Sequence, residues 1–334
     1  MKSTSQRDMF FLPWFWLFVL TLNAGDVSRT GVPRFRAVDT KGDFATDGKA
    51  MFARPIHLAF LDGRLSIVDA EESVVSVFDE RGRLIAQVGG RGQGPGQLDL
   101  PTAAWPDAGG VVVSDGRNRR IVRFDARGRE SGVLRLPFFP EAFLLLAGGR
   151  VLVARNPGVR DDPSAILNCF DRKGRPLWGA LPPAASRDRV ANALSNVVFL
   201  LGGSGGDIFV IFRNRATGIR RFSSDGRELG EIRLGRDYPV RRVKKDIGPG
   251  KTLKAEVFCW HASYDEGRFY LLAADWTEDR DLGPGSEVYI AGTDGRVQGI
   301  IELPEKMTKI AASAERLYGL DLDYRLRVLK VESK

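Results

Sequence analysis

The chain has 334 residues, 43% of them hydrophobic, and no low-complexity tract, so we expect a folded globular protein with a large buried core rather than a disordered chain. The formal net charge at pH 7 is +8, and the sequence contains two histidines and two cysteines. It holds no HExxH motif, no zinc-type Cys/His spacing and no Gly-x-Ser-x-Gly elbow. These absences leave the common metalloprotease, zinc-finger and serine-hydrolase classes without support in the sequence.

Residues 1–24 are typical of a secretory signal peptide. Lys2 and Arg7 precede the apolar stretch MFFLPWFWLFVLTLNA, which ends at the small residue Ala24. This stretch contains Pro13 and is shorter than the roughly 20 residues of a membrane-spanning helix. We therefore expect an exported protein, periplasmic or extracellular, with a membrane-anchored form as the alternative if the segment is not cleaved.

The rest of the chain favours an all-β fold. It is rich in glycine, with 38 residues in the whole chain, and short runs of Val, Ile, Leu and Phe recur between glycine-containing turns. One turn pattern repeats five times, as FDERGR, FDARGR, FDRKGR, FSSDGR and AGTDGR. The glycines of these turns are Gly82, Gly128, Gly174, Gly226 and Gly295, which follow one another at intervals of 46, 46, 52 and 69 residues.

Each repeat predicts four antiparallel strands, which is one blade of a β-propeller. The last interval is too short for an additional blade, so we expect insertions there. Residues 307–331 predict three more strands, and residues 33–40 supply the fourth strand by pairing across the closure. Joining the two ends in this way removes exposed sheet edges. The prediction is a six-bladed β-propeller domain over residues 33–334, closed by an N-terminal strand.

The stretch GGRGQGPGQLDLP, residues 89–101, raises the question of a phosphate-binding loop. A phosphate cradle needs a following helix and, in its P-loop form, a Lys-Ser or Lys-Thr pair, and neither is present. Glycine permits positive φ and proline fixes φ. We therefore predict a tight crossing loop from the outer strand of one blade to the inner strand of the next.

Residues 92–128 resemble an NHL repeat of a bacterial six-bladed β-propeller. The resemblance rests on seven positions: Pro101, Asp115, Asn118, Arg119, Phe124, Asp125 and Gly128. NHL-like proteins include enzymes, protein-binding and RNA-binding domains and many exported proteins, so the resemblance implies the fold more strongly than an activity.

Two functions from different classes remain open. The first is a non-enzymatic binding or recognition module, for which no cofactor is predicted. The second is a hydrolase or lyase similar to the propeller lactonases, which hold a metal at the central tunnel with Glu, Asn and Asp ligands. Calcium or zinc is expected only for the second, and the sequence offers just the scattered Glu141 and Asn196 as counterparts.

Two further residue sets have a structural interpretation. Asp69, Asp115 and Asp321 follow strands at the start of turns, where Asp side chains bond to nearby backbone amides, so we expect turn caps rather than metal ligands. Cys169 and Cys259 fall in the third and fifth blades, which are not neighbours, so we expect two buried free thiols.

The segment 235–256, expected as an inserted crossing loop before the fifth blade, contains seven basic and three acidic residues. Arg241, Arg242, Lys244 and Lys245 are its candidates for contact with an anionic surface such as a lipid headgroup, a polysaccharide or an acidic protein. A solvated loop is the alternative. Membrane contact is expected through this segment or the N-terminal segment, and nucleic acid is not an expected partner because no aromatic residues interleave with the charges.

The last candidate site is the central tunnel. Aligning the inner strands on the residues that follow them (Gly63, Gly109, Gly149, Gly267 and Glu315) places His57, Ala103, Phe143, His261 and Lys309 at one repeat position. The three polar residues, His57, His261 and Lys309, belong to blades one, five and six, which are consecutive because blade six meets blade one at closure. His57, His261 and Lys309 are therefore predicted to surround one site for a small anionic ligand such as a carboxylate, or for acid/base work by a histidine. The alternative is that each is a separately satisfied polar residue.

Overall fold

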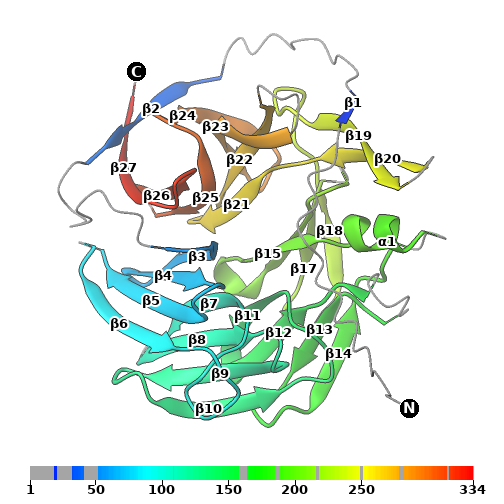
Figure 1. The fold of residues 1–334 in the computed structure, drawn as a ribbon. Coiled ribbons are helices and arrows are strands. Elements are labelled where there is room, and N and C mark those ends of the chain that lie inside the picture. Colours follow the sequence, from blue (N-terminus) through cyan, green and yellow to red (C-terminus); the bar gives the residue numbers. More distant parts are fainter. Residues whose placement is uncertain are drawn as a thin grey trace, which may run out of the picture.

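The computed structural model describes residues 19–20, 32–40, 52–80, 82–107, 109–157, 164–184, 188–215, 218–248, 251–277, 282–313 and 316–333. These residues form a six-bladed β-propeller in which each blade is a four-stranded antiparallel sheet, as predicted (Figure 1).

The first four blades are formed by consecutive strands. Blade 1 comprises β3 (Pro55–Leu61), β4 (Arg64–Asp69), β5 (Val74–Asp79) and β6 (Leu84–Gly89). Blade 2 comprises β7 (Pro101–Asp107), β8 (Gly110–Asp115), β9 (Arg120–Asp125) and β10 (Glu130–Arg135). Blade 3 comprises β11 (Ala142–Leu146), β12 (Arg150–Ala154), β13 (Leu167–Phe170) and β14 (Pro176–Ala180). Blade 4 comprises β15 (Val198–Gly202), β16 (Ile208–Phe212), β17 (Ile219–Phe222) and β18 (Glu228–Ile232).

The last two blades are joined through the N-terminal strand. Blade 5 comprises β21 (His261–Asp265), β22 (Arg268–Trp276), β23 (Leu282–Gly292) and β24 (Val297–Glu302). Blade 6 comprises β25 (Met307–Ala312), β26 (Arg316–Asp321), β27 (Leu326–Ser333) and β2 (Arg34–Asp39). The innermost strands β3, β7, β11, β15, β21 and β25 each contact the next one, and β25 contacts β3, so the ring is closed.

The predicted closure strand is confirmed, and it makes a second pairing. β2 runs antiparallel to β27, which completes blade 6, and its other edge pairs in parallel with β24 of blade 5. Arg34 at the start of β2 forms ion pairs with Glu302 and Glu287, which lie in blade 5. β2 therefore fastens the N-terminal part of the propeller to two blades at once.

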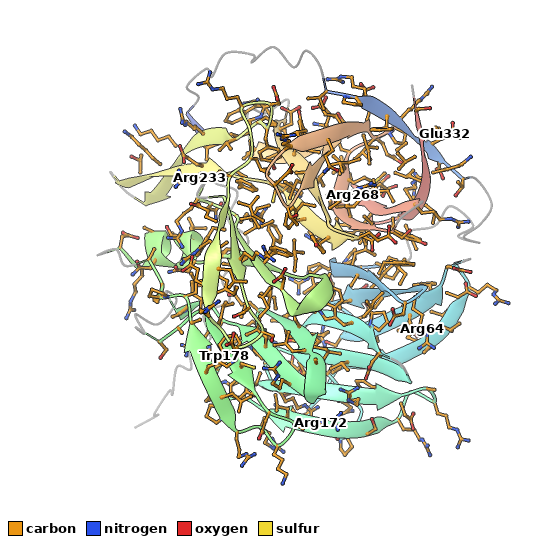
Figure 2. All side chains as sticks on the ribbon, turned by 180° about the vertical axis from the view of Figure 1, so that it is seen from behind. Arg64, Arg172, Trp178, Arg233, Arg268 and Glu332 are labelled. Carbon is orange, nitrogen blue, oxygen red and sulfur yellow. The ribbon has the colours of Figure 1, made fainter. Side chains whose placement is uncertain are left out.

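Burial explains why the inner and outer strands differ in composition. The second strand of a blade is covered on both faces by neighbouring blades, and all five residues of β16, IFVIF, are buried. The outer strand β18, ELGEI, has four exposed residues out of five. Side chains fill the spaces between the blades (Figure 2), so apolar runs mark inner strands and charged runs mark the rim.

The repeated turns join the third and fourth strands. In blade 2, Asp125 Oδ1 accepts hydrogen bonds from the backbone amides of Arg127 and Arg129, and Asp125 Oδ2 pairs with the Arg129 guanidinium at 2.9 Å. Gly128 has a φ of 72°, a conformation that glycine adopts at little cost. Asp171 repeats the contacts with Lys173 and Arg175 in blade 3.

Insertions account for the longest repeat interval. The segment expected as a crossing loop forms a hairpin of β19 (Arg241–Gly248) and β20 (Lys251–Val257), while β22 and β23 are longer than their counterparts in other blades. The hairpin packs through Val243, Ala255 and Val257 on a small apolar cluster around Ala274. The sequence analysis expected a crossing loop here, because the many charged residues obscure the alternation of apolar and polar positions that is typical of a strand.

Short elements complete the described chain. β1 (Val19–Leu20) pairs antiparallel with β19, and the other residues of the predicted signal segment lie outside the described residues. The helix α1 (Arg189–Ser195) is capped by Asp188, and the 3-10 turns η1 (Ala147–Gly149) and η3 (Ser204–Gly206) follow β11 and β15. Nowhere in the described ranges is a helix both long and apolar enough to span a bilayer.

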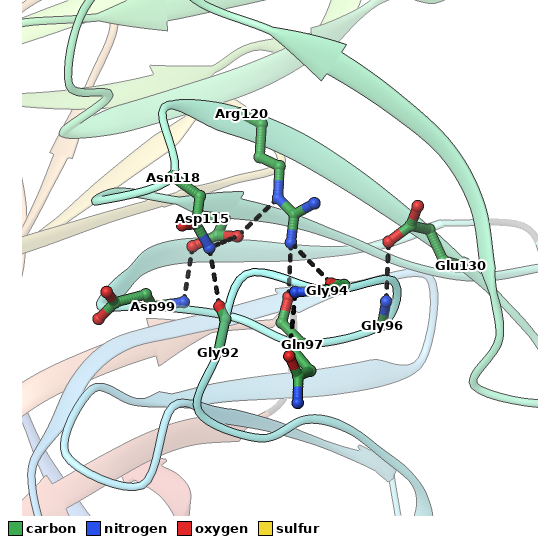
Figure 3. A network of polar contacts seen from close by, with 9 residues as sticks. All are labelled: Gly92, Gly94, Gly96, Gln97, Asp99, Asp115, Asn118, Arg120 and Glu130. Atoms are coloured by element: carbon green, nitrogen blue, oxygen red, sulfur yellow. Dashed lines mark hydrogen bonds and ion pairs between the residues drawn. The ribbon is translucent and has the colours of Figure 1, made fainter.

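The glycine-rich stretch carries the chain from β6 to β7, which confirms its prediction as a crossing loop. Asp115 and Arg120 of blade 2 hold it in place (Figure 3): Asp115 Oδ1 accepts from the Asp99 amide at 2.8 Å, and the Arg120 guanidinium donates to the carbonyl oxygen of Gln97 at 2.8 Å. Asn118 donates to the carbonyl oxygen of Gly92. The loop is thus bonded within itself and to turn residues of both blades that it connects.

The other predicted structural residues behave as expected. Asp69 accepts from the amides of Ala53, Arg54, Glu71 and Glu72, and Asp321 accepts from those of Asp323 and Arg325, so both cap turns. Both cysteines are free and buried. No group of three or more His, Cys, Asp and Glu side chains is arranged to hold a metal ion in the described part of the chain.

Candidate functional site

Strand pairing places the predicted tunnel residues at one level of the ring. His57 pairs with Val68, His261 with Leu272 and Lys309 with Leu320. In each pair the two residues are the same number of positions apart in the sequence, so all three lie equally far from the turn between the first and second strands of their blade. Ala103 shares this register, whereas Phe143 and Phe199 pair with the next strand across a shorter and a longer connection. We call the six inner-strand residues the channel level: His57, Ala103, Phe143, Phe199, His261 and Lys309. Glu315, used in the sequence alignment of blade 6, lies outside the described residues.

Both histidines make the same contact with the next blade. His57 Nδ1 accepts from the backbone amide of Ala104 at 3.4 Å, and His261 Nδ1 accepts from that of Ile310 at 3.4 Å. An imidazole nitrogen that accepts a hydrogen bond carries no proton, so the neutral ring bears its proton on Nε2. Each histidine therefore keeps an N–H donor on the side of the ring away from the neighbouring strand.

The three predicted residues are electrostatically coupled. Burial, with a contribution from the Lys309 charge, lowers the pKa of His57 to about 3. Burial, Lys309 and His57 all lower the pKa of His261 well below its ordinary value. Burial, and then the nearby Arg213, lower the pKa of Lys309 to about 8. At pH 7 both histidines are thus neutral donors, and Lys309 is largely charged.

Arg213 is a fourth member of this cluster that the sequence analysis missed. It directly follows β16 in blade 4, and its guanidinium stacks on the Trp260 ring at 4.6 Å from the ring centre. Burial lowers the pKa of Arg213. The sequence signal for Arg213 is its position immediately after the wholly apolar run Ile208–Phe212. The alignment of repeats compared only the innermost strands, and Arg213 follows a second strand.

The cluster is cationic and lacks an internal counter-ion. Among the residues that the structure describes, no carboxylate or other acceptor bonds to the Lys309 amino group. Lys309 and Arg213 are half-buried, and holding like charges together with partial loss of hydration is unfavourable unless another group compensates. The arrangement of Lys309, Arg213 and two histidine N–H donors is therefore suited to hold an anion.

The residues named for a metal-dependent enzyme do not form one site. Asn196 is buried and bonds through its amide to Ala184 and Asn192, so its polar atoms serve the backbone. Glu141 precedes β11 in blade 3, where burial raises the pKa of its carboxyl to about 7. Among the described residues, no hydrogen bond or ion pair joins the Glu141 carboxyl to Asn196.

The four predicted residues of the basic hairpin differ in their surroundings. The Arg241 guanidinium donates to the Ala274 carbonyl oxygen and pairs with Asp275 at 3.1 Å, so it serves the packing of the hairpin. Arg242 is exposed and pairs with Glu256 across the strands at 2.9 Å. Lys244 lies opposite Lys254 in the register, and the side chain of Lys245 lies outside the described residues. Of the described side chains, Arg242 and Lys244 share the face opposite to buried Val243.

Comparison with known proteins agrees with the fold. A family model described as a 6-bladed beta-propeller matches residues 44–152. No curated protein sequence matches the chain.

Three solved structures illustrate the structural likeness. A candidate exported protein from Bacteroides fragilis has a TM-score of 0.55 at 11% identity, covering 93% of this chain and 98% of its own. A member of the DUF4221 family from Bacteroides vulgatus has a TM-score of 0.54 at 12% identity, covering 91% and 98%. A gluconolactonase from Xanthomonas campestris has a TM-score of 0.51 at 14% identity, covering 94% and 100%. At these identities the likeness establishes the propeller fold and no activity.

Proposed function

We propose that this protein is an exported, NHL-like β-propeller that acts as a non-enzymatic recognition module and binds a small anionic ligand in its central channel. The observation that supports the proposal is the cluster of His57, His261, Lys309 and Arg213, which come from four consecutive blades and lack an internal counter-ion among the described residues. The NHL-like sequence of blade 2 and the apolar segment ending at Ala24 support the family and the export.

A carboxylate fits the chemistry of this cluster. Lys309 and Arg213 supply positive charge, and charge-assisted hydrogen bonds from such groups are stronger than neutral ones. The two neutral histidines supply N–H donors that cost no additional buried charge. An anion placed among them would also raise the pKa of Lys309 back toward its ordinary value, because an opposite charge favours the charged form.

The proposal is tested by calorimetric titration of the purified protein with a panel of small carboxylates. Lys309→Met keeps the length of the side chain and removes its charge, so it should abolish binding that the wild-type protein shows. Lys330→Met, at an exposed side chain of β27, is the matched control and should bind as wild type does. Equal affinity of Lys309→Met and wild type would refute a channel site.

A hydrolase or lyase is the second candidate, and the raised pKa of Glu141 favours it. A carboxyl group with a pKa of about 7 can exchange a proton near neutral pH, as a general acid or base does. Metal analysis of dialysed protein together with assays of lactone hydrolysis would separate the two functions. Stoichiometric calcium or zinc, with turnover lost in Glu141→Gln, would support the enzyme.

A further inference from the structure

The channel level has two unlike halves. Going around the ring, its cationic and histidine residues occupy blades 5, 6 and 1, and its apolar residues occupy blades 2, 3 and 4. The apolar members Ala103 and Phe143 are each 1% exposed, so they support the wall from behind. A uniformly charged ring would suit a free inorganic anion, whereas a divided ring suits a ligand with two unlike ends.

An aromatic ring borders each end of the cationic half. The Trp105 indole meets His57 edge-on with ring centres 5.6 Å apart, and the Phe199 ring meets His261 in the same way at 5.5 Å. Both aromatic residues are half-buried. Lys309, which influences the titration of both histidines, stands between them in blade 6. The order around the channel is therefore aromatic, histidine, lysine, histidine, aromatic.

The indole presents an apolar surface. Its only polar atom, Trp105 Nε1, donates to the Phe143 carbonyl oxygen at 2.8 Å. This bond ties blade 2 to blade 3 and fixes the orientation of the ring. A ligand that meets this wall gains from burying apolar area and has no free indole donor to satisfy.

Glu141 limits the charge that a ligand can carry at the apolar side. It lies two residues before Phe143, about 7 Å along an extended strand. Once ionised, its carboxylate repels a second negative charge on that side of the channel. The apolar side therefore accepts an uncharged body and disfavours a second carboxylate.

We propose that the channel ligand is a monocarboxylate with an apolar, preferably aromatic, body, whose carboxylate lies at Lys309 and whose body lies against Trp105 and Phe199. This inference rests on the proposed anion site and adds the class of the ligand. It distinguishes three otherwise similar anions: a monocarboxylate without a body, one with a body, and one with a second carboxylate on the body.

The test is calorimetric titration of the full-length protein at pH 8 with acetate, phenylacetate and 4-(carboxymethyl)benzoate. Phenylacetate should bind about tenfold or more tightly than acetate, because it also buries a phenyl ring. The dicarboxylate should bind more weakly than phenylacetate. Glu141→Gln should recover much of that difference.

Phe199→Leu tests the wall with a mild change in a packed region. It should weaken phenylacetate several-fold and leave acetate unaffected, and a melting curve reports whether the variant is folded. The comparison among ligands on wild-type protein needs no variant at all. Equal affinities for acetate and phenylacetate would overturn the ligand class while leaving the anion site in place. Failure of all three carboxylates to bind would overturn both proposals.

Discussion

Arg120 Nε donates to Asp115 Oδ2 at 2.8 Å, and both side chains are almost completely buried. The same guanidinium bonds to the carbonyl oxygens of Gln97 and Gly94, while the other carboxylate oxygen accepts from the Asp99 amide. One ion pair thus links β8 and β9 to the crossing loop that leads into blade 2. This is the structural role of the glycine-rich stretch, since its glycines bring backbone carbonyls within reach of the arginine.

Breaking this pair should destabilise the protein strongly. In Arg120→Ala the Asp115 carboxylate loses its buried counter-ion, and such a loss costs about 3–5 kcal/mol. Arg129→Ala is the control because it removes an arginine that is 67% exposed in its side chain and pairs with Asp125 at the rim. Urea denaturation followed by tryptophan fluorescence should show a large loss of unfolding free energy for the first variant and little change for the second. Similar losses in both would contradict the assignment.

The repeated turn made the fold predictable. Five copies of the turn marked five blades, and the strands predicted at the two ends of the chain supplied the sixth. The short turns after the inner strands gave the register of His57, His261 and Lys309. The additional pairing of β2 with β24 was not predicted, because the sequence of an edge strand does not specify its second neighbour.

The site was less predictable than the fold. Arg213 was missed because its approach to Lys309 depends on how blades 4 and 6 are placed around the ring, which no local pattern encodes. The NHL resemblance pointed to Arg119, whereas the buried bonds are made by Arg120. Arg119 adopts a φ of 50° in the turn, and Arg120 is the first residue of β9. A difference of one position decided which side chain reaches the core.

The closure strand offers a comparison between neighbouring residues. Ala37 of β2 is 1% exposed and packs in the cluster shared by blades 5 and 6, whereas Val38 is 38% exposed. Ala37→Asp places a charge in that cluster and should lower the melting temperature by many degrees, because a buried unpaired carboxylate is costly. Val38→Asp should have a small effect. Equal melting temperatures of the two variants would show that β2 does not close the ring in solution.

The basic hairpin gives a prediction for anionic surfaces. Replacing Arg242 and Lys244 by Gln should weaken retention on phosphatidylglycerol vesicles and reduce its salt dependence, because exposed charges act over about a Debye length. The melting temperature should stay constant. Arg241→Gln should instead lower the melting temperature, since it loses bonds to Ala274 and Asp275. Unchanged vesicle retention in the double variant would leave the hairpin as a solvated element.

Export can be tested directly on the expressed protein. If residues 1–24 act as a signal peptide, the mature chain should begin near Gly25 and be recovered outside the cytoplasm of a bacterial host. N-terminal sequencing and cell fractionation measure both properties. Replacing Leu17, Phe18 and Val19 by Asp removes the apolar character of the segment and should leave the full-length chain in the cytosol. Recovery of Met1 from soluble cytosol in the unaltered protein would contradict export.

The pH dependence of the unfolding free energy tests the lowered pKa of Lys309. Its pKa in the folded protein is about 8, below the ordinary value of 10.5, so between these pH values the unfolded chain binds more protons than the folded one. Stability therefore rises with pH across this window, by about 3 kcal/mol from this group alone. Other groups titrate in the same range, so the measured quantity is the difference in unfolding free energy between wild type and Lys309→Met at pH 7 and at pH 10. At pH 7 the unfolding free energy of Lys309→Met should exceed that of wild type, because Met has no charge to desolvate. At pH 10 the difference between the two unfolding free energies should move in favour of wild type. A difference independent of pH would mean that Lys309 keeps an ordinary pKa, and hence that its amino group is solvated rather than held among Arg213 and the two histidines.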